Sequence, residues 1–157
     1  MKNKKLLSDI KEYLKCYENQ VLEDWYELIR HISVSETGEG IETCCDWIQK
    51  KMEEIGIQVT KYSVEPAPVL VGRFGNDPEK KTVLIYAHYD VKPAGERKLW
   101  HSDPFVPTVR DGKVYARGSA DNKSPLMAHL KALEYFIRRK MEVPVNVIFV
   151  FEGDEEC

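Results

Sequence analysis

The chain has 157 residues and a formal net charge of −3, and 43% of its residues are hydrophobic while 31% are charged. These values are typical of a folded domain and exclude a disordered or collagen-like chain. The charge is too balanced for a nucleic-acid-binding surface or a polybasic membrane anchor, and no apolar run approaches the roughly 20 residues that span a bilayer. We therefore expect neither nucleic acid nor a membrane as a partner.

The start of the chain carries basic residues but lacks the apolar core and small-residue cleavage site of a secretory signal. Its four cysteines, Cys16, Cys44, Cys45 and Cys157, show no CxxC spacing. Without an export signal, reduced thiols in a cytoplasmic protein are the expected state. A zinc site built from cysteines is not expected.

Two stretches near the start predict helices. Apolar residues recur at helical spacing from Leu6 to Ile32, which predicts one long helix or two helices broken near Asn19. After a polar loop they recur from Ile41 to Ile55, and Gly56 follows where a helix end favours a residue with positive φ. The period then changes, and residues 57–64 and 69–74 are predicted strands.

Two apolar runs, Thr82–Ala87 and Val145–Phe151, are typical of strands covered on both faces, as in a parallel sheet flanked by helices. Between them lies a stretch punctuated by proline and glycine, Val91–Gly118, and then a helix that we expect Ser124 and Pro125 to start. This order of helices and strands predicts an α/β fold.

The first apolar strand ends in a possible metal-binding pair. In open α/β sheets, ligands bind beyond the carboxyl ends of the strands. His88 and Asp90 follow the strand two positions apart, which places them on the same face if the strand continues. His88 could bind a metal through one ring nitrogen while Asp90 accepts a hydrogen bond from the other. Alone, the pair could equally be a histidine at the core edge beside a surface aspartate.

The second apolar strand ends in an acidic cluster, with four carboxylates in the five residues Glu152–Glu156. Crowded like charges repel, and a divalent cation would relieve that repulsion. A glutamate here could also act as general base on a metal-bound water. The alternative is a solvated acidic tail. Asp121 lies at a loop-to-helix junction, where a carboxylate can bridge two metals or simply cap the helix.

Other catalytic motifs are absent from the sequence. It contains no GxSxG, no GxxxxGK[ST], no GxGxxG after a strand and no HExxH. The remaining histidines, His31, His101 and His129, have no ligand partners at a useful spacing, and we expect them to be structural or solvated.

Three segments together, TVLIYAHYDVKPAG, LWHSDPFVPTVRDGKVYARGSADNKS and VNVIFVFEGDEE, resemble the dinuclear zinc metallopeptidases. That family contains carnosinases and other dipeptidases, aminoacylases, succinyl-diaminopimelate desuccinylases and glutamate carboxypeptidases. The HYDV and W-x-x-DPF-x-P stretches are most similar to the dipeptidase branch. The resemblance implies a three-layer α/β catalytic domain with a mostly parallel central sheet. Residues 1–157 would be its truncated amino-terminal portion, without the lid or dimerisation domain and the remainder of the catalytic domain.

The resemblance implies a role for five residues. His88 and Glu156 match metal ligands, and Asp121 matches the carboxylate that bridges both metals. Asp90 matches the aspartate that orients the histidine, and Glu155 matches the general base. Two zinc ions are implied, with cobalt or manganese as other candidates. The implied reaction is hydrolysis of a dipeptide or N-acyl amino acid amide bond by a metal-activated water that Glu155 deprotonates.

One geometric condition accompanies these roles. Glu155 and Glu156 are adjacent, so on a regular strand they would point to opposite faces of the sheet. Both can reach one metal site only if the strand has already ended, and Gly153 makes such a turn plausible.

The chain also departs from the family pattern. Asn122 and Ser124 stand where the family usually has aspartate and glycine, and Cys157 stands where the family continues with a Gly-Ser stretch. Three of the five expected protein ligands are present, so we expect the chain alone to bind zinc weakly, to have low or no activity and to be poorly soluble. A homodimer is possible for the full-length form. The competing hypotheses are a non-catalytic remnant or interaction module with a peptidase-like fold, and a small flavodoxin-like binding domain.

Overall fold

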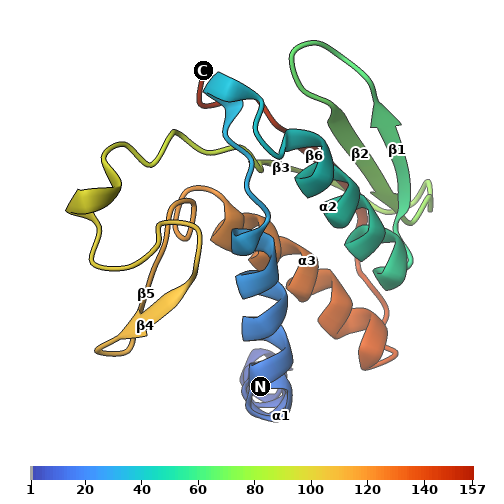
Figure 1. Cartoon of the computed structure of the whole chain (residues 1–157). Helices are drawn as coiled ribbons and strands as arrows, with labels where there is room; N and C mark the ends of the chain where they lie inside the picture. The colour runs from blue at the N-terminus through green and yellow to red at the C-terminus, as the bar shows by residue number, and fades with distance from the viewer. Residues whose placement is uncertain (1) are drawn as a thin grey trace.

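The computed structural model of the protein describes residues 2–157 and has the predicted α/β architecture. Its three helices are α1 (Lys2–Arg30), α2 (Ile41–Ile55) and α3 (Lys123–Arg138), as labelled in Figure 1. Its six strands are β1 (Gln58–Tyr62), β2 (Val69–Phe74), β3 (Thr82–His88), β4 (Thr108–Arg110), β5 (Lys113–Tyr115) and β6 (Asn146–Glu152). Two short 3₁₀ helices, η1 (Ser35–Thr37) and η2 (Arg97–Leu99), lie in connecting segments.

The main sheet has the strand order β1-β2-β6-β3. β3 and β6 are parallel, whereas β2 is antiparallel to both β1 and β6. The expectation of a mostly parallel sheet is therefore corrected to a mixed sheet over the described residues. The short loop between β1 and β2 can join only antiparallel neighbours, while the long connection through α3 allows β3 and β6 to run parallel.

The hydrophobic core lies between the sheet and helices α2 and α3. β6 alternates regularly, with Val147, Phe149 and Phe151 buried and the intervening side chains half-buried. Buried side chains of the two helices pack against this face of the sheet: Cys44, Cys45, Ile48, Met52, Leu126 and Leu130. Alternation of this kind is expected when one face of a strand is packed and the other is not.

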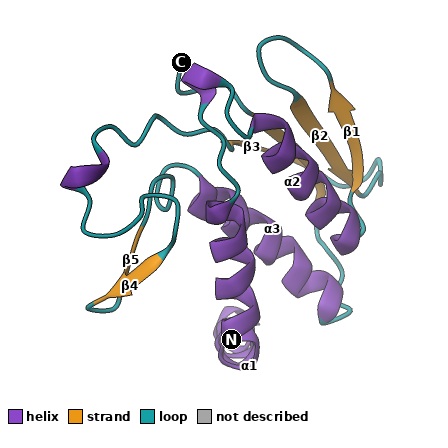
Figure 2. Cartoon of the chain, viewed as in Figure 1, coloured by secondary structure: helices purple, strands orange, loops and turns teal. Residues whose placement is uncertain are grey.

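The helices gather on one side of the sheet, as Figure 2 shows. On the opposite face, the β3 side chains Leu84 and Tyr86 are exposed, Leu84 by 63%. The sequence predicted strands covered on both faces. Within the described residues only one face carries helices, so two of the three expected layers are present.

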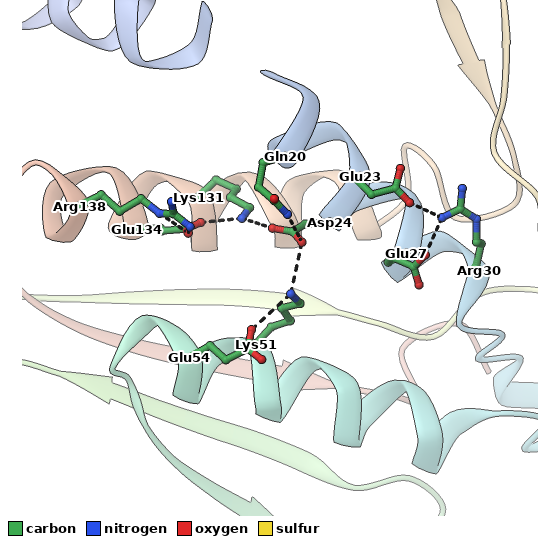
Figure 3. Close-up of polar contacts among 10 residues, drawn as sticks. All are labelled: Gln20, Glu23, Asp24, Glu27, Arg30, Lys51, Glu54, Lys131, Glu134 and Arg138. Carbon is green, nitrogen blue, oxygen red and sulfur yellow. Dashed lines mark hydrogen bonds and ion pairs between the residues drawn. The ribbon is translucent and has the colours of Figure 1, made fainter. Parts of the chain in front are cut away.

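Helix α1 is continuous through Asn19, which resolves the choice between one helix and two. It packs along α3, where the Tyr13 ring meets the Tyr135 ring edge-on at 5.1 Å. A polar network crosses the same contact. Asp24 accepts hydrogen bonds from Lys131 of α3 and from Lys51 of α2, as shown in Figure 3.

The structure differs from the sequence prediction at two local features. The stretch between Val91 and Gly118 contains a hairpin of β4 and β5, whose turn residues Asp111 and Gly112 have φ of 50° and 70°. Positive φ at both positions defines a type I′ turn, and Asp-Gly is its strongest sequence signal. Helix α3 begins at Lys123 with Asn122 as its N-cap and no side-chain cap bond, not at Ser124 and Pro125.

None of the helices in residues 2–157 combines the length and the apolar character needed to cross a membrane.

Candidate metal centre

The carboxyl ends of β3 and β6 lie side by side. The two strands pair in parallel register up to His88 opposite Glu152, and the backbone N–H of Tyr89 donates to the Glu152 carbonyl at 2.8 Å. The residues that follow each strand therefore emerge at the same edge of the sheet, where open α/β folds bind ligands.

His88 is held in one orientation by Asp90. Both residues are buried, with His88 5% exposed and Asp90 0% exposed. His88 Nδ1 lies 3.3 Å from a carboxylate oxygen of Asp90 and 3.2 Å from its backbone carbonyl. Nε2 is then left facing Asp121, 3.1 Å from Oδ1. β3 ends at His88, so the turn after the strand, and not the strand period predicted from sequence, brings Asp90 to the ring.

Asp121 reaches the same place from the loop before α3. Its side chain is 75% exposed and interacts with the His88 ring. Helix capping was the alternative reading of this carboxylate, but the N-cap position belongs to Asn122, with no side-chain cap bond. Asp121 is therefore free of the helix and available to a ligand.

The acidic residues after β6 form an ordered turn. The backbone N–H groups of Glu155 and Glu156 donate to the two oxygens of Asp90, at 3.2 and 2.9 Å. Glu155 Oε2 lies 3.8 Å from His88 Nε2. Because β6 has ended at Glu152, both adjacent glutamates can turn toward one site. This ordered arrangement does not match a solvated acidic tail.

Gly153 allows this turn by leaving space. A Cβ at this position would lie 2.5 Å from the ring of Tyr89, which is fully buried and donates from its hydroxyl to the Pro68 carbonyl at 2.6 Å. Any side chain would force either the ring or the turn to move.

Three side chains form a cluster suited to a metal ion. One ligand atom each from His88, Asp121 and Glu156 lies within 4.8 Å of the others. An imidazole nitrogen with carboxylate oxygens is a donor set for zinc, and also for cobalt or manganese. The residues present therefore fit a divalent cation.

The electrostatics of the cluster favour positive charge. Burial lowers the pKa of His88, but the hydrogen bond and charge of Asp90, with the charge of Glu155 and the hydrogen bond to Asp121, outweigh burial and raise that pKa to about 9. Burial raises the pKa of Asp90, while hydrogen bonds from His88 and from the Glu156 backbone lower it below its usual range. The site stabilises a proton on His88 for the same reason that it would stabilise a cation.

The five residues selected from the sequence lie together here: His88, Asp121 and Glu156 form the cluster, while Asp90 and Glu155 lie beside the His88 ring. His31, His101 and His129 do not join the cluster. The sequence reasoning missed Ser33, whose hydroxyl donates to the Tyr89 carbonyl at 2.6 Å across 56 residues of sequence. It also gave no role to Lys123, which is buried. The hydrogen bond of Ser33 and the burial of Lys123 leave no periodic signal in the sequence, because both depend on segments that meet only in the folded chain.

Comparison with known proteins matches this geometry to a family. The model of "Peptidase family M20/M25/M40" matches residues 84–157, the segment that contains all five site residues. The Cys-Gly metallodipeptidase of Schizosaccharomyces pombe is 43% identical over 110 residues. The chain belongs to peptidase family M20/M25/M40.

Further relatives in the family are also dipeptidases. The cysteinylglycine-S-conjugate dipeptidase of Corynebacterium striatum is 32% identical and aligns with 99% of this chain and 35% of its own. The crystal structure of human carnosine dipeptidase 1 superposes with a TM-score of 0.88 at 29% identity, over 96% of this chain and 35% of that one. A dipeptidase structure from Saccharomyces cerevisiae superposes with a TM-score of 0.84 at 28% identity, over 95% of this chain and 35% of that one.

The match covers a minor part of each relative. The alignment with the Schizosaccharomyces pombe enzyme takes in 68% of this chain but 23% of that protein. The chain therefore spans between 23% and 35% of the length of these relatives.

Proposed function

We propose that this chain supplies the amino-terminal part of the catalytic centre of a metal-dependent dipeptide hydrolase. The observation that carries the proposal is the convergence of His88, Asp121 and Glu156, whose ligand atoms lie within 4.8 Å of one another. Asp90 orients the His88 ring in this cluster. The relatives support the reaction class, since one is a metallodipeptidase and another is a dipeptidase by name. The gathering of all the site residues in one ordered cluster gives no support to a non-catalytic remnant or a flavodoxin-like module.

Each residue has a distinct part in this proposal. His88, Asp121 and Glu156 would hold the metal. Asp90 fixes the tautomer of His88 by accepting from Nδ1, which leaves Nε2 free to coordinate. When bound, the metal supplies Lewis acidity toward the scissile carbonyl and the attacking water.

Glu155 is the proposed general base. Its carboxylate lies beside the cluster, 3.8 Å from His88 Nε2, and its side chain is 48% exposed, so that substrate and water can approach it. It would take a proton from the attacking water and return it to the amine that leaves. The substrate proposed is a dipeptide or an N-acyl amino acid. Two zinc ions, a cytoplasmic location and a homodimer of a full-length form stay predictions.

Zinc binding tests the proposal. Titration of the metal-free chain should show binding that His88→Ala abolishes, while His129→Ala, outside the cluster, leaves it unchanged. Hydrolysis of Cys-Gly and β-Ala-His in the presence of zinc should be weak or absent, because the chain contributes three of the protein ligands that the resemblance implies. Whatever turnover is found should disappear in Glu155→Gln. Zinc binding that survives His88→Ala would overturn the proposed site, and robust turnover by the chain would contradict the low-activity prediction.

A further inference from the structure

A buried lysine lies directly behind the candidate metal centre. Lys123, the first residue of α3, is 1% exposed. Its Nζ donates to the backbone carbonyls of Leu28 at 3.1 Å and His31 at 2.5 Å. A buried ammonium is costly without hydrogen-bond partners, and the carbonyls at a helix carboxyl end lack partners within the helix. Lys123 and the end of α1 therefore satisfy each other, and the helix dipole adds to the attraction.

The same lysine closes the loop that carries Asp121. Its backbone N–H donates to the Gly118 carbonyl at 3.2 Å. A Cβ on Gly118 would lie 2.6 Å from Cγ1 of Val91 and 3.4 Å from Cδ of Lys123, so the lysine stem and Val91 fill the space under the loop. The loop is thus packed from below by the side chain whose ammonium is fixed to α1.

The segment that follows α1 also contacts the other half of the site. Ser33 donates from its hydroxyl to the Tyr89 carbonyl at 2.6 Å, and its own carbonyl accepts from the Val91 N–H at 2.8 Å. The segment after α1 is therefore bonded to the residues on either side of Asp90. Through Lys123 the same segment is bonded to the start of α3, two residues after Asp121.

We propose that Lys123 is a positioning residue, which sets the separation of Asp121 from His88 by fixing the start of α3 to the carboxyl end of α1. This inference rests on the proposed metal site. Asp121 has an exposed side chain on a loop, so its position relative to the buried His88 depends on what anchors that loop. Lys123 provides the anchor, and Ser33 connects it to the turn that holds His88 and Asp90.

The chain offers a matched control in Lys131. This residue lies about two turns further along α3, and its side chain is 12% exposed. Its ammonium bonds to Asp24 of α1 and to Glu134, as Figure 3 shows. Lys131 thus ties α3 to α1 as Lys123 does, but away from the metal centre. A purely structural tie predicts the same behaviour for both lysines.

The test compares Lys123→Met with Lys131→Met in two measurements. The first is the zinc dissociation constant, obtained by competition with a chelating dye below the melting temperature of each variant. The second is amide hydrogen exchange of the 116–122 loop, followed by mass spectrometry without metal. We expect Lys123→Met to weaken zinc binding by about tenfold or more and to speed exchange in this loop. Lys131→Met should lower the melting temperature but leave both readouts at wild-type values.

Equal effects of the two substitutions, or wild-type loop exchange in Lys123→Met, would overturn the inference. If Lys123→Met does not fold, Lys123→Gln keeps an uncharged NH₂ donor group on a shorter side chain. It should weaken zinc binding about threefold, as for the loss of one hydrogen bond, and unchanged zinc binding and loop exchange would overturn the inference. The exchange measurement separates this inference from the proposed function. A wild-type chain that binds no zinc refutes the metal site, and loop exchange then decides the role of Lys123 as an anchor.

Discussion

The carboxylate of Asp90 accepts the backbone N–H of Glu156 at 2.9 Å, across 66 residues of sequence. The same carboxylate lies 3.3 Å from Nδ1 of His88. One buried acid therefore orients the histidine and holds the turn that presents the paired glutamates. This dual contact explains why Asp90 is fully buried although it is not a member of the three-residue metal cluster.

Asp90→Asn should lower the pKa of His88. Burial alone would depress this pKa, and Asp90 is the foremost of the groups that raise it to about 9. An asparagine keeps the shape and one acceptor oxygen but removes the charge. The pKa should therefore move down toward the ordinary histidine value of roughly 6.5, as measured by NMR titration of the metal-free protein. His101→Gln serves as the control, and a His88 pKa that stays near 9 in Asp90→Asn would contradict the assignment.

The stability of the metal-free protein should fall between neutral and alkaline pH. The pKa of His88 is raised in the folded state, so the folded protein binds a proton more tightly than the unfolded chain. The stabilisation is fully present below about pH 6.5 and is lost as the pH rises through about 9. Urea unfolding at a series of pH values should show this loss, of roughly 3 kcal/mol at most. His88→Gln should remove most of it, and an equally steep fall in that variant would assign the effect to other groups.

The polar network around Asp24 should contribute more to stability than the surface ion pairs of the same helix. Asp24 and Lys131 have side chains 9% and 12% exposed, whereas Arg30 and its partner Glu23 are 40% and 54% exposed. Removing Lys131 leaves the largely buried Asp24 carboxylate with Lys51 as its remaining cation, at 3.3 Å. Lys131→Met should therefore destabilise the chain by about 2 kcal/mol or more, and Arg30→Met by about 0.5 kcal/mol or less. Figure 3 shows Lys131 and Arg30 with their partners. Urea unfolding of the two variants measures the difference in stability, and equal losses of stability would contradict the prediction.

Much of the fold follows from hydrophobic periodicity. The helix that ends at Gly56 and the strand at residues 69–74 occupy the predicted positions, because each has a clear apolar period and a recognisable boundary. The hairpin at Asp111 and Gly112 was missed because its strands are short and largely exposed, with little apolar alternation. The mixed sheet was missed because periodicity does not report strand direction.

The members of the candidate site could be selected from the sequence, whereas the contacts that connect them could not. His88 and the glutamates follow buried strands, so the rule for the carboxyl ends of strands locates them. The role of Asp90 in holding Glu155 and Glu156 depends on backbone N–H groups, which every residue has and which no motif marks. No sequence motif marks the hydrogen bonds of Lys123 to the carbonyls of Leu28 and His31 either.

Zinc binding should strengthen as the pH rises. A histidine ligand must be neutral, and the pKa of His88 is raised to about 9, so a proton competes with the metal at neutral pH. The apparent association constant should therefore increase about tenfold per pH unit between pH 6.5 and 8.5, with about one proton released per zinc ion. Calorimetry in buffers of different ionisation enthalpy measures both quantities. In Asp90→Asn the dependence should level off at lower pH, because His88 would already be neutral there. Binding without proton release in the wild-type chain would show that His88 is not the ligand, and with it the metal site proposed at the ends of β3 and β6 would fall.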